Sequence, residues 1–129
     1  MTRKQARDEA FILIFEKQFS DASAQEILEL ANEVRDLEPD DYIHTVFCGV
    51  VERNEELNQI ISEKAIGWKI DRISKISLAI LKLAIYEISY IDDIPASVSI
   101  NEAVELCKKY ATKEDASFVN GILASVVNA

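Results

Sequence analysis

The chain has 129 residues, of which 49% are hydrophobic and 29% are charged, with three glycines and two prolines. This composition is typical of one globular domain and excludes a disordered or fibrous chain. The net charge of −9 excludes a general nucleic-acid binder, because phosphates are repelled over most of an acidic surface. Any nucleic-acid site must therefore be local.

Capping boxes predict the first two helices. Thr2 with Gln5 opens a helix to about residue 19, and a second helix opens at Ser23 with Glu26. The apolar positions of this second helix, which we expect to face inward, are Ile27, Leu30, Ala31, Val34 and Leu37. The acids between them indicate a solvated outer face.

The third and fourth helices are predicted by their first residues. Pro39 and the two aspartates after it favour a helix start, because proline suits the first turn and acids suit the positive end of the helix dipole. Gly49 inside this third helix indicates a close contact with another helix. Asn54 is a suitable cap for a fourth helix, which ends before Gly67.

The stretch Ile73 to Ile91 concentrates the apolar side chains of the chain and is predicted as a central helix capped by Asp71. Only a thin line through Lys75, Lys82 and Ser89 is polar. Such a helix must be covered on nearly all sides. The covering is protein, since a membrane span needs about 20 mostly apolar residues.

Two more helices follow a break at Ile94-Pro95. Ser97 or Ser99 is expected to cap the sixth helix, and Thr112 the last one. The apolar spacing of the last helix continues through Asn120-Gly121, although this dipeptide elsewhere signals a hairpin turn. We therefore expect seven helices.

The seven helices predict an all-α fold in a single domain, residues 1–129. The segment Ala65 to Ile70 contains Gly67 and the only tryptophan, and is expected to be a hinge between subdomains of about residues 1–64 and 65–129.

Cys48 and Cys107 both fall on apolar helix positions and are not in a metal-type spacing. They indicate buried free thiols in a reducing compartment. The polar start of the chain has no apolar signal region behind it. We therefore expect a cytoplasmic location.

The basic residues Arg3, Lys4 and Arg7 open the first helix, whereas residues 8–62 hold fourteen acids and three bases. Cations at a helix N-terminus oppose the helix dipole at a cost of about 0.3–1 kcal/mol each. A phosphate-binding patch would explain them, since terminal N–H groups add donors to the guanidinium groups. An incidental basic N-terminus is the other interpretation.

Two further sites can be considered. His44, Cys48 and Glu52 share one helix face, which suggests a metal or thiol-imidazole site, although a packed histidine near a buried cysteine is the simpler interpretation. Glu87 lies in an apolar helix as either a structural acid or a partner-docking group. Burial of an unpaired carboxylate costs several kcal/mol, so we expect Glu87 at a helix end or exposed at an interface.

The sequence contains no glycine-rich phosphate loop, metal motif or visible active site, so neither an enzyme nor a cofactor is expected. Six strings are present in one order: Arg3-Lys-Gln-Ala-Arg7, Trp68-Lys-Ile-Asp-Arg-Ile, Ala79-Ile-Leu-Lys-Leu-Ala-Ile-Tyr-Glu-Ile, Ile94-Pro, Ser99-Ile-Asn-Glu-Ala-Val-Glu-Leu-Cys-Lys-Lys-Tyr and Phe118-Val-Asn-Gly-Ile-Leu. In this order and spacing they resemble the NusB family of bacterial transcription antitermination factors. The resemblance covers the whole chain and is poorest over residues 20–45.

The resemblance implies a bundle of three helices followed by a bundle of four. It also implies a non-catalytic adaptor that binds boxA RNA of ribosomal RNA leaders, pairs with the small-subunit ribosomal protein NusE and helps RNA polymerase resist termination. By family pattern, the RNA-contacting residues are Arg3, Lys4, Arg7 and Phe118, and the residues facing the ribosomal protein are Phe15 and Glu87. Many relatives have tyrosine where this chain has Phe15.

Two other functions compete with this one. A protein-only helical interaction module would bind a basic partner through its acidic face, with an incidental basic tip. Some ribosomal RNA methyltransferases carry a similar helical appendage, but these 129 residues hold no cofactor-binding half, so we expect no methylation by this chain alone. Salt-dependent RNA binding discriminates the adaptor from the protein-only module.

Overall fold

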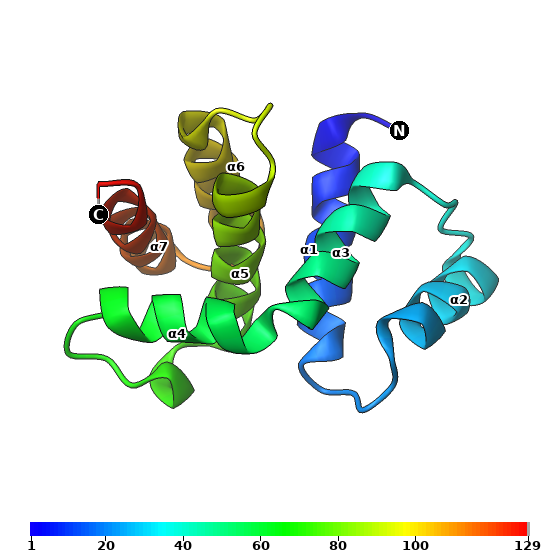
Figure 1. Ribbon diagram of the computed structural model, residues 1–129, viewed down its shortest axis with the longest axis horizontal. Helices are drawn as coiled ribbons and strands as arrows, with labels where there is room; N and C mark the ends of the chain where they lie inside the picture. The colour runs from blue at the N-terminus through cyan, green and yellow to red at the C-terminus, as the bar shows by residue number, and fades with distance from the viewer. Residues whose placement is uncertain (129) are drawn as a thin grey trace.

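The computed structural model describes residues 1–128 and shows seven α-helices and one 3-10 helix (Figure 1). The elements are α1 (Arg3–Lys17), α2 (Ala24–Arg35), α3 (Asp41–Glu52), α4 (Asn54–Lys64), η1 (Ile70–Arg72), α5 (Lys75–Tyr90), α6 (Ala96–Tyr110) and α7 (Lys113–Val127). The described residues form no strand, so the predicted all-α fold of seven helices is confirmed.

The helices form two groups that stand side by side, with α1 to α3 in one and α4 to α7 in the other (Figure 1). Helix α4 packs against α5 and α7, and less against α3. The chain therefore passes between the groups at Arg53, where α3 ends. The sequence break at residues 65–70, where we expected the boundary, lies between α4 and α5 of the second group.

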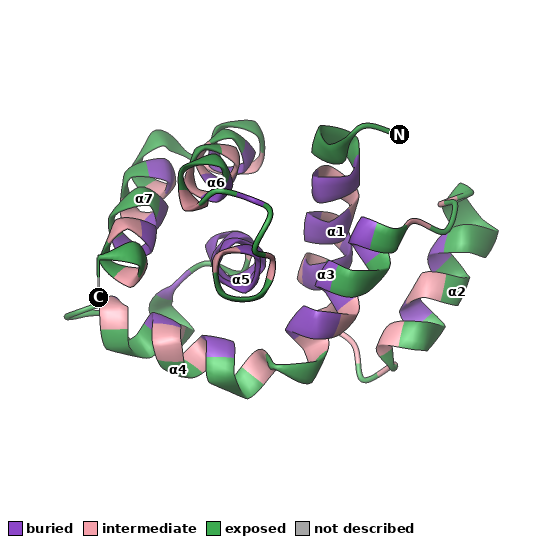
Figure 2. Cartoon of the chain, turned by 45° about the horizontal axis from the view of Figure 1, so that its top comes forward, coloured by how far each residue is buried: buried purple, intermediate pink, exposed green. Residues whose placement is uncertain are grey.

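Helix α5 is central, as predicted. It is seen almost end-on in Figure 2, with α4, α6 and α7 around it and α1 and α3 beside it. Every residue from Ser77 to Glu87 is buried. This includes Lys82, which belongs to the thin polar line of the sequence pattern but is only 6% exposed. Both bundles cover the middle of this helix, so the polar line is exposed only at Lys75 and Ser89.

Two predicted capping boxes and the predicted cap at Thr112 are confirmed. The side chains of Thr2 and Ser23 accept hydrogen bonds from the backbone N–H groups three residues later, which opens α1 and α2. Thr112 does the same for α7, with Asp115 as its reciprocal partner. Helix α7 also continues through Asn120 and Gly121, because tertiary packing of its apolar face outweighs the turn preference of this dipeptide.

The other predicted starts need correction. Asp40 caps α3, so Pro39 precedes the helix rather than lying in its first turn. Asn54 is the first residue of α4 and not its cap, because α3 runs almost directly into α4 at Arg53. Ser74 caps α5 in place of Asp71.

Helix α6 begins earlier than predicted. It starts at Ala96, directly after Pro95, whose fixed φ suits a helix entry. Ser97 and Ser99 therefore lie inside the helix. Ser99 is 2% exposed and uses its hydroxyl in a tertiary hydrogen bond instead of a cap.

Helix α2 is covered on one side only. It packs against α1 and α3, and buries Ile27 and Ala31. Leu30 and Val34, predicted to face inward, are 59% and 74% exposed. The prediction was wrong at these two positions because an apolar stripe indicates a face but not how much of it a neighbour covers.

Gly49 lies where α3 meets α5, as its position in the sequence suggested. A Cβ atom at Gly49 would overlap the ring of Tyr86, so any other residue here would force this ring to move. Within residues 1–128, no helix combines the length and apolarity needed to cross a membrane.

Candidate functional site

The basic residues of the sequence pattern lie at the N-terminal tip of α1. The Thr2–Gln5 capping box fixes this tip, with 2.8 Å from the Thr2 N–H to Oε1 of Gln5. The first turn holds no acid to offset its cations. The local sequence therefore places Arg3 and Lys4 on the outside of a rigid helix start.

Arg3 and Lys4 are both exposed, as expected of phosphate-binding groups. The Arg3 guanidinium carbon lies 4.7 Å from the centroid of the Tyr42 ring, close enough for a cation–π interaction. Lys4 is 3.3 Å from Glu102 of α6, with its side chain 67% exposed. Exposed ion pairs contribute little to stability, so Lys4 can exchange Glu102 for another anion.

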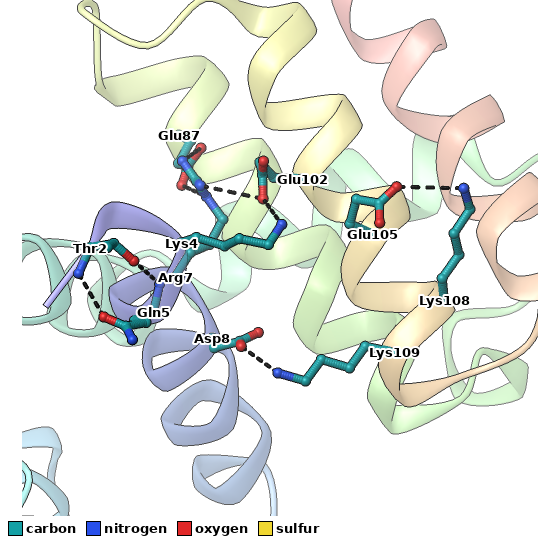
Figure 3. A network of polar contacts seen from close by, with 10 residues as sticks. All are labelled: Thr2, Lys4, Gln5, Arg7, Asp8, Glu87, Glu102, Glu105, Lys108 and Lys109. Atoms are coloured by element: carbon teal, nitrogen blue, oxygen red, sulfur yellow. Dashed lines mark hydrogen bonds and ion pairs between the residues drawn. The ribbon is translucent and has the colours of Figure 1, made fainter.

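Arg7 differs from its two neighbours. It is 4% exposed, and its Nε donates to Oε2 of Glu87 at 2.8 Å (Figure 3). The expectation that Arg7 is presented on the surface was wrong, because one turn after Arg3 the helix faces α5. Arg7 also lies 3.8 Å from Glu102. Its guanidinium is therefore already enclosed by protein carboxylates.

Glu87 is fully buried at the centre of this arrangement, with 0% exposure. It accepts hydrogen bonds from Arg7, from the hydroxyl of Tyr42, and from the Ser99 hydroxyl at 2.7 Å. The expectation of an exposed carboxylate was wrong. Three donors from α1, α3 and α6 satisfy it, which removes the cost of leaving a buried charge unpaired.

The protonation of this cluster follows from its burial. Burial opposes the charge of Arg7, but the hydrogen bond and the charge of Glu87 outweigh it and raise the pKa of Arg7. Burial also raises the pKa of Tyr42, and the negative charge of Glu87 adds to this effect. Tyr42 is therefore a neutral donor and Arg7 a permanent cation at any physiological pH.

A shallow groove runs beside the basic tip between α1 and α6. Its charged residues are Lys4, Arg7, Asp8, Glu102, Glu105, Lys108 and Lys109. Lys109 lies 2.6 Å from Asp8, and Lys108 lies 3.5 Å from Glu105 (Figure 3). Apart from the buried Arg7, the cations of the groove are therefore held in exposed ion pairs.

Sequence reasoning missed Lys108 and Lys109 as candidate binding residues. They belong to the last turn of α6, one hundred residues beyond the basic tip, and only the packing of α6 beside α1 brings them there. The Glu105–Lys109 spacing of four on one helix was a signal of an exposed charged face. It could not indicate which helix this face meets.

Phe118 is not among the residues that line this groove. It is half-buried on α7, and its ring centroid lies 5.3 Å from that of Trp68. Trp68 is 55% exposed and follows α4, next to Ile66, which is 89% exposed. The structure thus gives Phe118 an exposed aromatic neighbour that the sequence did not predict.

Phe15 lies in a row of aromatic rings along α1. Its ring centroid is 6.2 Å from that of Phe11 and 5.2 Å from that of Phe19, and Phe11 is 4.9 Å from Tyr110. Phe19 is 65% exposed. Phe15 and Phe19 also line a groove between α1 and α2. We name Phe15, Phe19, Leu30 and Val34 the apolar groove, because all four line it and its outer members are exposed.

The metal or thiol site considered from the sequence is not supported. Residues 1–128 contain no group of three or more histidine, cysteine or acidic side chains placed to hold a metal ion. Burial raises the pKa of the Cys48 thiol, which opposes activation as a nucleophile. Cys107 is buried, as expected, whereas Cys48 is half-buried, and both thiols are free.

Comparison with known proteins extends to nearly the whole chain. The model of the NusB family matches residues 4–128. The transcription antitermination protein NusB of Ruminiclostridium cellulolyticum is 45% identical over 128 residues, which covers 98% of this chain and 88% of the relative.

Solved structures agree with this match. T. maritima NusB superposes with a TM-score of 0.83 at 29% identity, covering 99% of this chain and 92% of the other. The crystal structure of the antitermination factors NusB and NusE in complex with dsRNA gives a TM-score of 0.86 at 26% identity. The match covers 98% of this chain and 96% of the other. Sequence and fold thus agree over nearly the full length, and the chain belongs to the NusB family.

Proposed function

We propose that this chain is an RNA-binding adaptor in transcription antitermination. It binds boxA-type leader RNA together with the ribosomal protein NusE and keeps RNA polymerase processive on ribosomal RNA operons in the cytoplasm. The support is the family, whose members are named transcription antitermination proteins, and a similar structure that contains NusE and dsRNA. The NusB family is not enzymatic, and this function requires neither cofactor nor small-molecule substrate.

The exposure of Arg3 and Lys4 is the observation that carries the RNA-binding part of the proposal. Their charges lie at a helix N-terminus, where unpaired N–H groups and the helix dipole also favour a phosphate. Lys108 and Lys109 extend the cationic surface along the adjoining groove. Arg7 contributes indirectly, by holding α1 against α5.

Aromatic stacking would supply the second part of RNA recognition. Single-stranded bases stack on exposed aromatic rings, with about 1–3 kcal/mol per base. Phe118 and Trp68 form such a pair of rings on the bundle of α4 to α7. In our proposal the phosphates bind near the tip of α1, and an unpaired base stacks on Trp68 beside Phe118.

The protein partner would bind the apolar groove, through Phe15 and its exposed neighbours. An exposed apolar surface of this kind is typical of a protein interface. Glu87 is enclosed and would act on the partner only indirectly, by fixing α1 against α5.

The basic tip can be tested with the double variant Arg3→Gln/Lys4→Gln. Each lost contact with a phosphate of single-stranded RNA lowers the slope of log affinity against log salt by about 0.7, so the variant should bind more weakly with a slope lower by about 1.4. Filter binding of the NusE complex to boxA RNA across a salt series measures the affinity and its slope against salt. The matched control is Lys17→Gln/Lys75→Gln, which removes two cations from the end of α1 and the start of α5, far from the basic tip, and should leave the slope unchanged.

A protein-only interaction module is the second candidate. It is favoured by the ion pairs of Lys4, Lys108 and Lys109, which already use these cations within the chain. This function predicts no salt-dependent RNA binding by the wild-type complex. An unchanged affinity and slope in the Arg3→Gln/Lys4→Gln variant would refute the basic tip as the RNA site.

A further inference from the structure

A polar cavity of about 500 Å³ lies at the junction of the two bundles, at the end of α1 opposite the basic tip. The ends of α1 and α3 and the starts of α4 and α5 line it, with η1 at its edge, and it is open to solvent at Asp71 and Lys75. The polar lining relevant here consists of Lys17, Gln18, Asn54, Asn58, Asp71, Lys75 and Lys82. Neither the RNA surface nor the apolar groove proposed above includes these side chains.

Lys82 is the unusual residue of this cavity. It is 6% exposed, and within residues 1–128 it makes no hydrogen bond or ion pair with another side chain or with the backbone. The stem of Lys82 is buried, and its ammonium group meets only the solvent of the cavity, without a protein counter-charge. The Arg7–Glu87 pair shows that this fold can provide a counter-charge for a buried cation, but Lys82 has only the cavity in front of it.

The charge of the cavity is positive although the protein is acidic. Lys17, Lys75 and Lys82 face a single acid, Asp71, which leaves two positive charges in the lining. The nearby Lys75 and, above all, burial lower the pKa of Lys82 to about 8. An anion in the cavity would relieve both effects, because it would replace lost hydration and offset the like charge.

The amide side chains of the cavity are incompletely bonded. Gln18 donates to the carbonyl oxygen of Lys75 at 2.9 Å, but its own Oε1 has no hydrogen-bond partner. Asn58 likewise has a buried Oδ1 without a partner. Buried polar atoms are normally satisfied, so two such acceptors beside an unpaired lysine indicate a site for a polar molecule.

From these contacts we propose that the cavity binds a small phosphate-class anion, either inorganic phosphate or a phosphate monoester. A phosphate dianion matches the two positive charges, and its oxygens accept hydrogen bonds from the lysines and from the Asn54 and Asn58 amide groups. The hydroxyl groups of a monoester would donate to the unpaired oxygens of Gln18 and Asn58. The volume of the cavity is sufficient for either ligand.

This site is separate from the RNA surface. Lys17 is the last residue of α1 and Arg3 is the first, so the 15-residue helix places them about 20 Å apart. Loss of the phosphate site therefore leaves the RNA-binding proposal unaffected.

The test is a titration of the whole chain with inorganic phosphate. The NMR signals of the Ser20 and Asn58 backbone amides report binding. Sodium chloride keeps the ionic strength constant, and a parallel titration uses glycerol 3-phosphate. Saturable shifts are expected for at least one of the two. The titration in which binding is tighter identifies the free anion or the ester as the ligand.

Three variants separate a specific site from general charge effects. Lys82→Met removes the buried charge at similar length and should weaken binding at least tenfold, while Lys17→Gln, at the rim, should weaken it several-fold. Lys113→Gln removes an exposed cation of α7 outside the cavity and should bind as wild type. Thermal melts show that the variants are folded.

The pH profile provides a second readout. Lys17, Asp71 and Lys75 are the other charged groups in the lining, and α3 and α4 contribute uncharged residues to it. Wild-type affinity should fall above pH 8, where Lys82 loses its proton, and this fall should be absent in Lys82→Met. Shifts that do not saturate, or equal affinity in wild type and Lys82→Met, would overturn the proposal.

Discussion

Arg7 of α1 and Glu87 of α5 form a buried ion pair across the junction of the two bundles, with 2.8 Å between Nε and Oε2. Tyr42 and Ser99 complete the bonding of the carboxylate, so helices α1, α3, α5 and α6 meet at one charge. The pair places a cation of the basic segment in the core. It also makes the relative position of the bundles depend on one polar cluster.

Breaking this pair from one side should be strongly destabilising. Glu87→Gln leaves the Arg7 charge buried without its counter-ion, and we expect a loss of about 3–5 kcal/mol in the free energy of unfolding. Arg7→Met should cost a similar amount. Urea denaturation measures both variants.

The double variant Arg7→Met/Glu87→Met completes a double-mutant cycle. Its cost should be well below the sum of the single variants, because neither charge remains buried alone. Additive costs would show that the two residues act independently. Glu87→Lys, which would suit an exposed docking residue, should fail to fold because it places a second cation beside Arg7.

Gly49 and Gly121 provide a matched pair of helical glycines. Gly49→Ala forces a Cβ into the Tyr86 ring and should destabilise by about 1–3 kcal/mol. Gly121→Ala has open space around its Cβ and should stabilise by about 0.5–1 kcal/mol, because alanine is the better helix former. Thermal melts of the two variants measure this contrast. Equal shifts in melting temperature would mean that the α3–α5 contact is not close.

Lys82 should make stability depend on pH. Its pKa is about 8 in the folded protein and 10.5 ordinarily, so between these values the unfolded chain binds more protons and stability rises with pH. After allowance for partial screening by solvent, the gain is about 1–3 kcal/mol. Below pH 8 the lysine is charged in both states and its full burial cost remains.

The Lys82→Met variant isolates this effect from other titrating groups. It should be more stable than wild type at pH 7, and the difference should shrink as the pH approaches 10. Urea midpoints of both proteins from pH 7 to pH 10 give the comparison. A difference that is constant over this range would show that the Lys82 proton is not linked to folding.

The apolar groove should contribute to partner binding but not to stability. Phe19→Ser removes a ring that is 65% exposed, so the free energy of unfolding should change by less than about 0.5 kcal/mol. If the ring is an interface anchor, affinity for NusE should fall by about 1–3 kcal/mol, or 5- to 150-fold. Calorimetric titration measures the affinity. Val98→Ser, at an exposed apolar residue of α6, is the control and should bind normally.

The sequence by itself determined the helices, because their signals are local. The hydroxyls of Thr2, Ser23 and Thr112 cap the backbone three residues later, and a period of 3.6 residues is visible in any amphipathic segment. The dense apolar run around Leu81 likewise required a covered helix, which α5 is. Family membership also followed from the sequence, since the motifs and their order are present in the chain itself.

Only the tertiary structure decided which polar residues are exposed. Arg3, Lys4 and Arg7 look equivalent in the sequence, but one turn of helix separates a surface cation from one buried against Glu87. Lys75 and Lys82 likewise look equivalent in the polar line of α5, but Lys75 is exposed and Lys82 is buried. The reason is physical: the burial of a charge depends on donors and acceptors from distant segments, and a local pattern contains no information about them.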